Sequence, residues 1–328
     1  MKETIIIKID GDNEMGLGHV YRSLNLAKEL KRKNYKIVFL TKSLIIKKII
    51  PKIFTIKKSK NNTKDLQNIL NKLNPKIVII DKLKENSNEL KILNKNSSII
   101  AIDYTAKNKK IIRFGINMLY QKSGIHGKNS FSGFNLTILS DSIRNKKPIK
   151  ISRKVKTILV IQGGSDTPCN TPTIIDSLNK IYEDIQINVI VGTAFECWKK
   201  LHKSINNSIH NVKLFHNIKN IGEVMQKNDI AITGGGMTSL ELCHLGIPSI
   251  IICGASFENE TSSLLEKNGF GINLGYKKKL SKEKIAVTVK ELMMNYKQRK
   301  AMNKIGQRLV DANGVKRVSE IISRMMLQ

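Results

Sequence analysis

The amino-acid sequence predicts an α/β fold made of two Rossmann-like domains that face an interdomain cleft. Short apolar runs suited to buried parallel strands recur along the chain, and segments with helical spacing of apolar residues separate them. The alternation appears in each half of the chain, and a basic, polar stretch over residues 145–156, which contains Pro148, interrupts it. We therefore expect one domain over residues 1–150 and a second over residues 151–328.

Four apolar runs in the N-terminal half are expected to form strands of a parallel sheet. They cover residues 5–9, 36–40, 77–80 and 99–102. Leu24, Ala27 and Leu30 recur on one helical face, which predicts an amphipathic helix over residues 21–31. Residues 57–76 are dense in Lys and Asn, so we expect a solvated helix there.

The C-terminal half repeats this pattern with five further apolar runs. They cover residues 157–161, 187–191, 212–215, 229–233 and 249–253. Residues 282–327 have a helical periodicity that breaks near Asn313 and Gly314, where the glycine would cap one helix before the next begins. Ligands of open α/β sheets bind outside the carboxyl ends of the strands, so the glycine-rich turns of both halves are expected to line one cleft.

The chain is strongly basic, with 57 Lys and Arg against 26 Asp and Glu and a formal net charge of +31. The lysines are spread among Asn and Ile residues, aromatic residues make up 5%, and no segment combines clustered Arg with stacking rings. This distribution argues against a specific nucleic-acid partner, and a general compositional bias explains the charge more simply. Weak association with anionic membranes or acidic substrates remains an alternative.

The cysteines and the hydropathy pattern predict a cytoplasmic protein. Cys169, Cys197, Cys243 and Cys253 form no C-x-x-C pair and no zinc-site spacing with histidine, so reduced thiols and no metal site are expected. No apolar stretch approaches the roughly 18 residues that span a bilayer. Because only three residues precede the first apolar run, a signal peptide is not expected either.

A glycine turn near the N-terminus places a histidine where a strand gives way to a helix. Gly16 and Gly18 lack a Cβ atom, so they permit positive φ angles and the close approach of a ligand. The N–H groups of the following helix attract anions. The His19 imidazole is of the type that accepts a proton from water or a sugar hydroxyl at neutral pH, although a histidine here can also simply cap the helix.

A second glycine turn, over residues 234–236, lies between a strand and a helix in the C-terminal half. Gly235 and Gly236 precede Thr238 and Ser239, which offers backbone N–H groups and two hydroxyls to a diphosphate. One turn further along, Glu241 is placed to accept two hydrogen bonds from a ribose diol. The alternative is a structural turn in which Thr238 and Glu241 form a capping box.

Two further polar turns follow predicted strands in the same half. Gly164 and Ser165 precede Asp166 in one of them, and a ligand contact and an Asx-type turn are both open for Asp166. Asn259 lies in the other, over residues 254–260, which is also expected at the carboxyl end of the sheet.

Three motifs together resemble the pseudaminic-acid pathway UDP-sugar hydrolases, which share a group with spore-coat polysaccharide biosynthesis proteins of the SpsG type. The motifs are the G-x-G-H-x-x-R turn of Gly16, Gly18, His19 and Arg22, the residues Gly163 to Asp166, and the glycine-rich block that contains Ser239, Glu241, Gly246 and Pro248. The resemblance extends over nearly the whole chain, including residues 311–318. It implies the GT-B glycosyltransferase fold, related to the MurG-type transferases.

The resemblance also implies a mechanism. His19 in the N-terminal domain would activate a water that attacks the anomeric carbon of UDP-2,4-diacetamido-2,4,6-trideoxy-altropyranose and expels UDP with inversion. In the C-terminal, nucleotide-binding domain, Glu241 would hold the ribose, Thr238 and Ser239 the diphosphate, and Asn259 the sugar or phosphate. Neither a metal nor a cofactor is implied, because a helix N-terminus and basic side chains neutralise the diphosphate.

Arg22 and Lys8 are the basic side chains available for that charge. Asp10, the third residue of the motif Lys8-Ile9-Asp10, is a further expected substrate-binding residue. The family shows Arg-x-Asp where this chain has Lys8-Ile9-Asp10, and an Asp-Asp pair where it has Asp103 and Tyr104. These differences lie in the half expected to bind the acceptor, so two alternatives stay open. One is a GT-B glycosyltransferase with a UDP-sugar donor, and the other is a noncatalytic basic protein that binds nucleotides or polyanions.

Overall fold

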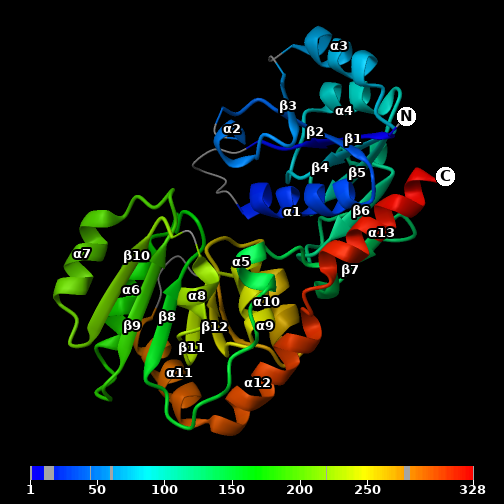
Figure 1. Ribbon diagram of the computed structural model, residues 1–328. Helices are drawn as coiled ribbons and strands as arrows, with labels where there is room; N and C mark the ends of the chain where they lie inside the picture. The colour runs from blue at the N-terminus through cyan, green and yellow to red at the C-terminus, as the bar shows by residue number, and fades with distance from the viewer. Residues whose placement is uncertain are drawn as a thin grey trace. The chain divides into compact units, whose positions relative to one another are not determined.

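The computed structural model describes residues 2–10, 18–44, 46–59, 62–218, 220–276 and 281–327. The chain divides into two compact units, each with its own parallel sheet (Figure 1). Among the described residues, the first unit holds 2–10, 18–140 and 312–327, and the second holds 141–311. The predicted α/β class with two Rossmann-like domains is confirmed.

The first unit is built on a seven-stranded parallel sheet in the order β3-β2-β1-β4-β5-β6-β7. The strands are β1 (Thr4–Lys8), β2 (Lys36–Thr41), β3 (Thr55–Lys58), β4 (Ile77–Ile80), β5 (Ser98–Ile102), β6 (Phe114–Asn117) and β7 (Ser130–Ser132). Their helices are α1 (Gly18–Arg32), α2 (Ile46–Ile49), α3 (Thr63–Leu73), α4 (Ser87–Asn94) and α13 (Gly314–Met326). The strand order reverses between β1 and β4, which is where open α/β sheets bind ligands.

The second unit repeats this topology with a six-stranded parallel sheet in the order β10-β9-β8-β11-β12-β13. The strands are β8 (Thr157–Ile161), β9 (Gln186–Val191), β10 (Asn211–His216), β11 (Ile230–Thr233), β12 (Ser249–Ile252) and β13 (Ile272–Gly275). The corresponding reversal of strand order lies between β8 and β11.

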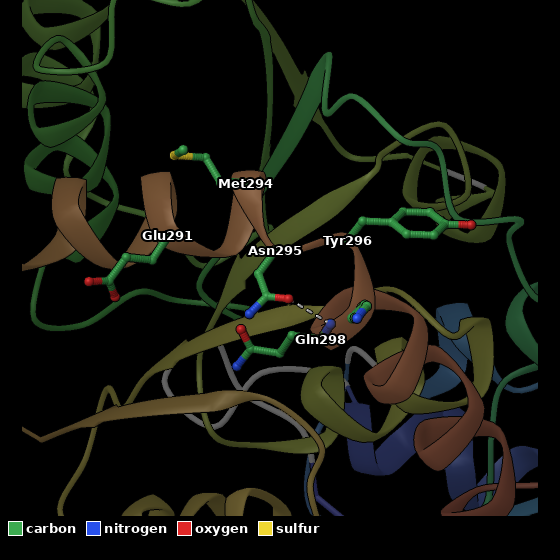
Figure 2. A pocket seen from close by; sticks show the side chains of 6 residues that line it. Glu291, Met294, Asn295, Tyr296 and Gln298 are labelled. Carbon is green, nitrogen blue, oxygen red and sulfur yellow. Dashed lines mark hydrogen bonds between the residues drawn. The ribbon is translucent and has the colours of Figure 1, made fainter.

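In the second unit a helix follows each strand along the chain: α6 (Asn170–Leu178), α7 (Trp198–Asn206), α8 (Ile221–Met225), α9 (Met237–Leu245), α10 (Glu258–Lys267) and α11 (Lys282–Met294). The others are α5 (Asp141–Arg144), which precedes β8, and α12 (Tyr296–Leu309), which follows α11. The turn between α11 and α12 borders a hollow of about 740 Å³ (Figure 2). No predicted site residue lines this hollow, whose lining residues run from Glu291 to Gln298.

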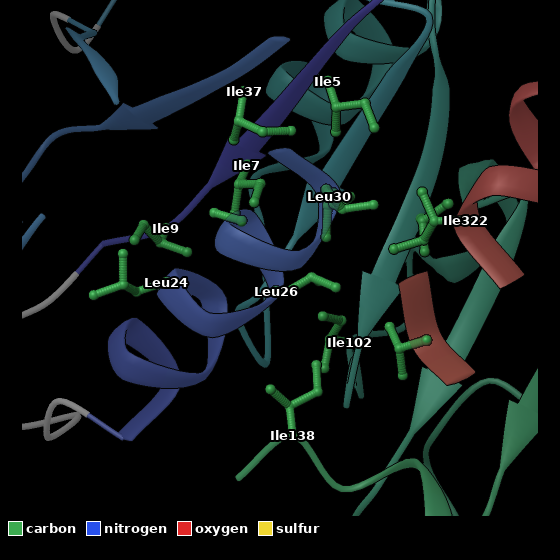
Figure 3. Close-up of a cluster of buried hydrophobic side chains, with 14 of the residues drawn as sticks. Ile5, Ile7, Ile9, Leu24, Leu26, Leu30, Ile37, Ile102, Ile138 and Ile322 are labelled. Atoms are coloured by element: carbon green, nitrogen blue, oxygen red, sulfur yellow. The ribbon is translucent and has the colours of Figure 1, made fainter. Parts of the chain in front are cut away.

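Alternate residues of β1 point to opposite faces of the first sheet and divide its core in two. Ile5 and Ile7 pack with Leu26 and Leu30 of α1 and with Ile322 of α13 (Figure 3). The intervening residue of the strand packs with leucines of α3 and α4 on the other face. Both faces are covered, which explains why the strands read as continuous apolar runs.

The C-terminal helix α13 belongs to the first unit, so the predicted assignment of residues 312–328 to the second domain differs from the structure. Val315 and Val318 lie in the same core cluster as α1. The helix α5, which the prediction assigned to the first domain, belongs to the second unit. Its Ile143 is fully buried, and its backbone packs closely on α8, because a Cβ on Gly222 would lie 2.0 Å from the Ser142 carbonyl oxygen. The units therefore divide after residue 140 and not at the predicted boundary between 150 and 151.

Gly314, the first residue of α13, lets this helix pack closely on the backbone near Thr137 in the first unit. A Cβ at this position would lie 2.1 Å from the backbone oxygen of Thr137, and backbone cannot move aside as a flexible side chain can. We expect Gly314→Ala to lower the free energy of unfolding by about 3 kcal/mol or more. Urea unfolding of the variant measures this loss, and an unchanged midpoint would contradict the tight packing of α13.

Two of the four cysteines are paired, which corrects the expectation of four reduced thiols. Cys169 and Cys197 form a disulfide with a Cα–Cα distance of 5.9 Å, whereas Cys243 and Cys253 are free and buried. The paired residues lie in the segments that follow the adjacent strands β8 and β9. The sheet brings them together although 28 positions separate them in the sequence.

Candidate functional site

Asp10 lies just beyond β1, next to the carboxyl ends of the neighbouring strands β2 and β4. Its Oδ1 accepts hydrogen bonds from the Lys42 backbone N–H at 2.6 Å and the Thr41 hydroxyl at 3.2 Å. Its Oδ2 pairs with Lys82 Nζ at 2.7 Å. Burial by itself would raise the pKa of Asp10, but the Lys42 N–H and the Lys82 ammonium outweigh burial and lower it.

His19 stands on the first turn of α1, next to Asp10. Its Nε2 forms a hydrogen bond with the backbone oxygen of Asp10. A carbonyl can only accept, so in the neutral imidazole Nε2 carries the proton and the lone pair lies on Nδ1. Among the residues that the structure describes, none forms a hydrogen bond with Nδ1. The role of His19 as a general base stays a prediction.

The glycines of this turn are only partly covered by the structure. Gly18 is exposed, and a Cβ on it would meet no atom of the described residues within 4 Å. The predicted substrate-binding residue Gly16 lies outside the described residues.

Arg22 is buried and paired internally, which corrects its predicted role as a substrate contact. Its Nε lies 3.0 Å from both carboxylate oxygens of Asp81, its Nη2 pairs with the same group, and its Nη1 lies 2.6 Å from Asp103 Oδ2. Burial disfavours the charged guanidinium, but the two aspartates more than offset this and raise the pKa of Arg22. The guanidinium therefore holds the carboxyl ends of β4 and β5 and is not directed at a diphosphate.

Lys8 is likewise unavailable for a diphosphate. It is 1% exposed, and its Nζ lies 2.7 Å from Glu85 and 3.0 Å from Glu89. Both predicted sources of side-chain positive charge are thus used within the first unit.

In the second unit, an unpredicted carboxylate bridges two glycine turns. Glu258 Oε2 accepts hydrogen bonds from Gly235 N–H at 3.1 Å and Gly254 N–H at 2.7 Å. Burial raises the pKa of Glu258, and these N–H groups partly offset the effect. A Cβ on Gly235 would lie 2.9 Å from the Glu258 Cβ and 2.4 Å from Ser262 Oγ, so this contact requires glycine. Part of the predicted diphosphate cradle is therefore occupied by the protein's own carboxylate.

The remaining residues of the α9 turn differ in exposure. Ser239 is fully buried and its hydroxyl donates to the Gly236 oxygen at 2.7 Å, which corrects its predicted contact with a diphosphate. Gly236, Thr238 and Glu241 are partly exposed. The N-cap of α9 is Gly236 without a side-chain cap, so the alternative capping box is not formed. Burial of its carboxyl raises the pKa of Glu241 to about 7.

The turn after β8 combines a structural residue with accessible ones. Asp166 accepts the Asn170 and Thr171 N–H groups at 2.8 Å each. These bonds reach four and five residues along the chain, so Asp166 satisfies the first N–H groups of α6 and does not form the Asx-type turn, which would bond two residues on. Gly164 is exposed, and Ser165 is partly exposed with its hydroxyl 3.1 Å from that of Thr167.

Asn259 lies on the first turn of α10. Its Oδ1 accepts a hydrogen bond from Asn273 Nδ2 at 3.1 Å. The side chain remains partly exposed.

Within the described part of the chain, no group of three or more His, Cys, Asp or Glu side chains is arranged to hold a metal ion. None of the described helices is long and apolar enough to span a membrane.

Sequence comparison finds similarity to one protein-family model and to two full-length proteins. Residues 157–318 match the family model of the glycosyltransferase family 28 C-terminal domain. The chain is 33% identical over 275 residues to the uncharacterized protein MJ1062 of Methanocaldococcus jannaschii, a match that covers 78% of this chain and 56% of that protein. It therefore spans little more than half of that relative's length. It is 22% identical over 345 residues to the spore coat polysaccharide biosynthesis protein SpsG of Bacillus subtilis, across 97% of both.

Comparison with solved structures shows the fold. MurG of Acinetobacter baumannii aligns with a TM-score of 0.72 at 12% identity, over 99% of this chain and all of that one. The calicheamicin glycosyltransferase CalG4 aligns with a TM-score of 0.68 at 13% identity, over 100% and 99% of the two chains. The two parallel-sheet units thus have the GT-B fold that the resemblance implied.

Proposed function

From its place among SpsG-like proteins of the GT-B fold, we propose that this chain is an enzyme that acts on a nucleotide sugar. The specific proposal is a hydrolase that releases UDP from a deoxy-diacetamido sugar, in the biosynthesis of a nonulosonic acid or a surface polysaccharide. The likeness to SpsG over nearly the full length of both chains supports the biosynthetic context.

The observation that carries the proposal is the state of His19. Its Nε2–H is engaged by the Asp10 carbonyl, which leaves Nδ1 as the proton acceptor. In the proposed step Nδ1 takes a proton from water, the water oxygen bonds to the anomeric carbon, and the bond from that carbon to the UDP oxygen breaks. UDP leaves with the electron pair of that bond, and the configuration at carbon inverts.

The second unit would bind the UDP part of the substrate. The first turn of α9, with Gly236 at its N-cap, offers backbone N–H groups and a positive helix end to the diphosphate. Thr238 adds a partly exposed hydroxyl, and Glu241 a carboxyl for the ribose diol. Glu258 already occupies the Gly235 N–H, so the diphosphate would contact the helix start and not that glycine.

A glycosyltransferase that uses a UDP-sugar donor is the second candidate. The match of residues 157–318 to the family 28 C-terminal domain favours it. Hydrolase and transferase would share the base and the nucleotide site and differ in the nucleophile. Incubation with UDP-, CMP- and GDP-sugars, with and without acceptor sugars, separates them. Release of UDP without an acceptor supports hydrolysis, release only with an acceptor supports transfer, and no release under either condition contradicts both.

Glu241 leads to a prediction on the pH dependence of nucleoside binding. Because its pKa is about 7, the carboxylate that accepts two ribose hydroxyls is the minor form at pH 6 and the major form at pH 8. We expect uridine to bind about 10-fold more tightly at pH 8 than at pH 6. Uridine is the suitable probe because it carries no phosphate that titrates in this range.

Glu241→Gln should remove this pH dependence and weaken uridine binding at pH 8 by about 10-fold, the cost of losing hydrogen bonds to a charged acceptor. The matched control is Glu291→Gln, an exposed carboxylate on α11 of the same unit. Calorimetry of the three proteins makes the comparison. A wild-type affinity that does not change with pH would remove Glu241 from the ribose site.

A further inference from the structure

Six residues of alternating charge form a ring at the carboxyl ends of β1, β2 and β4, joined by five side-chain ion pairs and closed by one backbone hydrogen bond. In order around this charge ring they are Asp10, Lys82, Glu85, Lys8, Glu89 and Lys42. The Nζ–carboxylate distances are 2.7 Å for Lys82–Asp10, 3.3 Å for Lys82–Glu85, 2.7 Å for Lys8–Glu85 and 3.0 Å for Lys8–Glu89, and Lys42 also pairs with Glu89. The Lys42 N–H closes the ring on Asp10 at 2.6 Å.

The charge ring is neutral and largely shielded from water. The side chains of Lys8 and Glu85 are 2% and 3% exposed, and those of Lys82 and Asp10 are 14% and 15% exposed. Ion pairs with so little solvent contact are weakly screened, so removal of one member leaves a partner whose charge is poorly compensated. The ring therefore fixes the positions of its members more firmly than surface pairs would.

Asp10 connects the ring to His19. Its carboxylate is held from β2 by Thr41 and Lys42 and from the end of β4 by Lys82. Its backbone oxygen is the acceptor for His19 Nε2. A carboxylate anchored on both sides restricts the backbone angles of its own residue, and so directs the carbonyl toward the imidazole.

We propose that Lys82 is a positioning residue: it holds Asp10 so that the Asp10 carbonyl keeps His19 in the tautomer with its lone pair on Nδ1. This inference rests on the proposed role of His19 as the base. Lys82 supplies the only side-chain cation on the Asp10 carboxylate among the described residues, while the Thr41 and Lys42 contacts are a neutral hydroxyl and a backbone N–H.

The test compares Lys82→Met with Lys82→Arg, which keeps the cation, and with the control Lys84→Met. Lys84 is exposed and lies two positions away in the same segment. The first readout is the ¹⁵N spectrum of the His19 imidazole, which distinguishes the two neutral tautomers without any turnover. We expect a single Nε2–H tautomer in the wild type, Lys82→Arg and Lys84→Met, and a mixture in Lys82→Met.

The second readout is steady-state kinetics on the nucleotide sugar that the wild type cleaves. We expect Lys82→Met to lower kcat about 10-fold with KM within about 2-fold, because positioning of the base and not substrate binding is impaired. Lys82→Arg should recover most of the loss. If Lys82→Met does not fold, Lys82→Gln, which keeps a neutral donor, is measured in the same way and is expected to show the tautomer mixture.

A wild-type tautomer pattern in Lys82→Met, or in Lys82→Gln where it takes the place of that variant, would overturn the proposal. A tautomer change in Lys82→Met combined with no cleavage of any nucleotide sugar by the wild type would leave the positioning role of Lys82 intact and refute the proposed function. The two failures are thus distinguishable.

Discussion

Replacement of His19 by Gln should lower kcat for UDP release by about 10²- to 10⁴-fold, the contribution of a positioned general base. The Gln side chain can still donate a hydrogen bond to the Asp10 carbonyl, as the His19 Nε2–H does, but it cannot take a proton from water at the position of Nδ1. The affinity for UDP should stay within about 2-fold of the wild type, because binding and proton transfer are separate contributions. Product release under saturating substrate and calorimetry with UDP measure the two effects.

His126→Gln is the matched control for this experiment. The His126 Nε2 also bonds to a backbone oxygen, that of Gln121 at 2.7 Å, but it lies in the segment between β6 and β7. The control variant should turn over at the wild-type rate. Equal losses in both variants would indicate a general structural effect, and unchanged turnover in His19→Gln would exclude His19 as the base.

Most of the sheet was predictable because parallel strands covered on both faces must be apolar throughout. The run Ile77–Ile80 is buried at every position and was recognisable from its residues alone. In contrast, β3 reads Thr-Ile-Lys-Lys and is mostly exposed, and β7 has three residues of which two are serine. These strands lie at the sheet edges, where backbone hydrogen bonds to an existing neighbour define the strand and little apolar side-chain area is needed.

The candidate site was predictable in its location but not in its internal pairing. Glycine turns after strands pointed to the carboxyl ends of both sheets, where Asp10, His19 and Glu241 are found. The sequence shows which residues can carry charge, but not which opposite charges the fold will place beside them. Glu258 illustrates this: its carboxylate accepts the Gly235 N–H although it lies 23 positions further along the chain, beyond the next strand, and no local sequence pattern predicts that contact.

Arg22 provides the largest expected effect on stability. Arg22→Met would leave the carboxylates of Asp81 and Asp103 buried without their cation, which typically costs about 3–5 kcal/mol. For a unit of about 150 residues, the size of the first unit, the melting temperature should fall by roughly 6–20 °C. Arg32→Met is the control on the same helix, because the Arg32 side chain is 65% exposed and its pair with Glu29 should contribute less than about 1 kcal/mol.

The pH dependence of that loss identifies its cause. Burial already raises the pKa of Asp103, and removal of Arg22 takes away the charge that opposes this. In the variant the Asp103 carboxyl would then bind a proton more tightly when folded than when unfolded, so the folded state loses stability as the pH rises above the ordinary pKa of an aspartate. Arg22→Met should therefore be closer to the wild type at pH 5 than at pH 7.5 in thermal unfolding. The opposite result would be a variant that melts like the wild type but binds UDP more weakly. Arg22 would then be a ligand contact, and its ion pairs with Asp81 and Asp103 would not stabilise the fold.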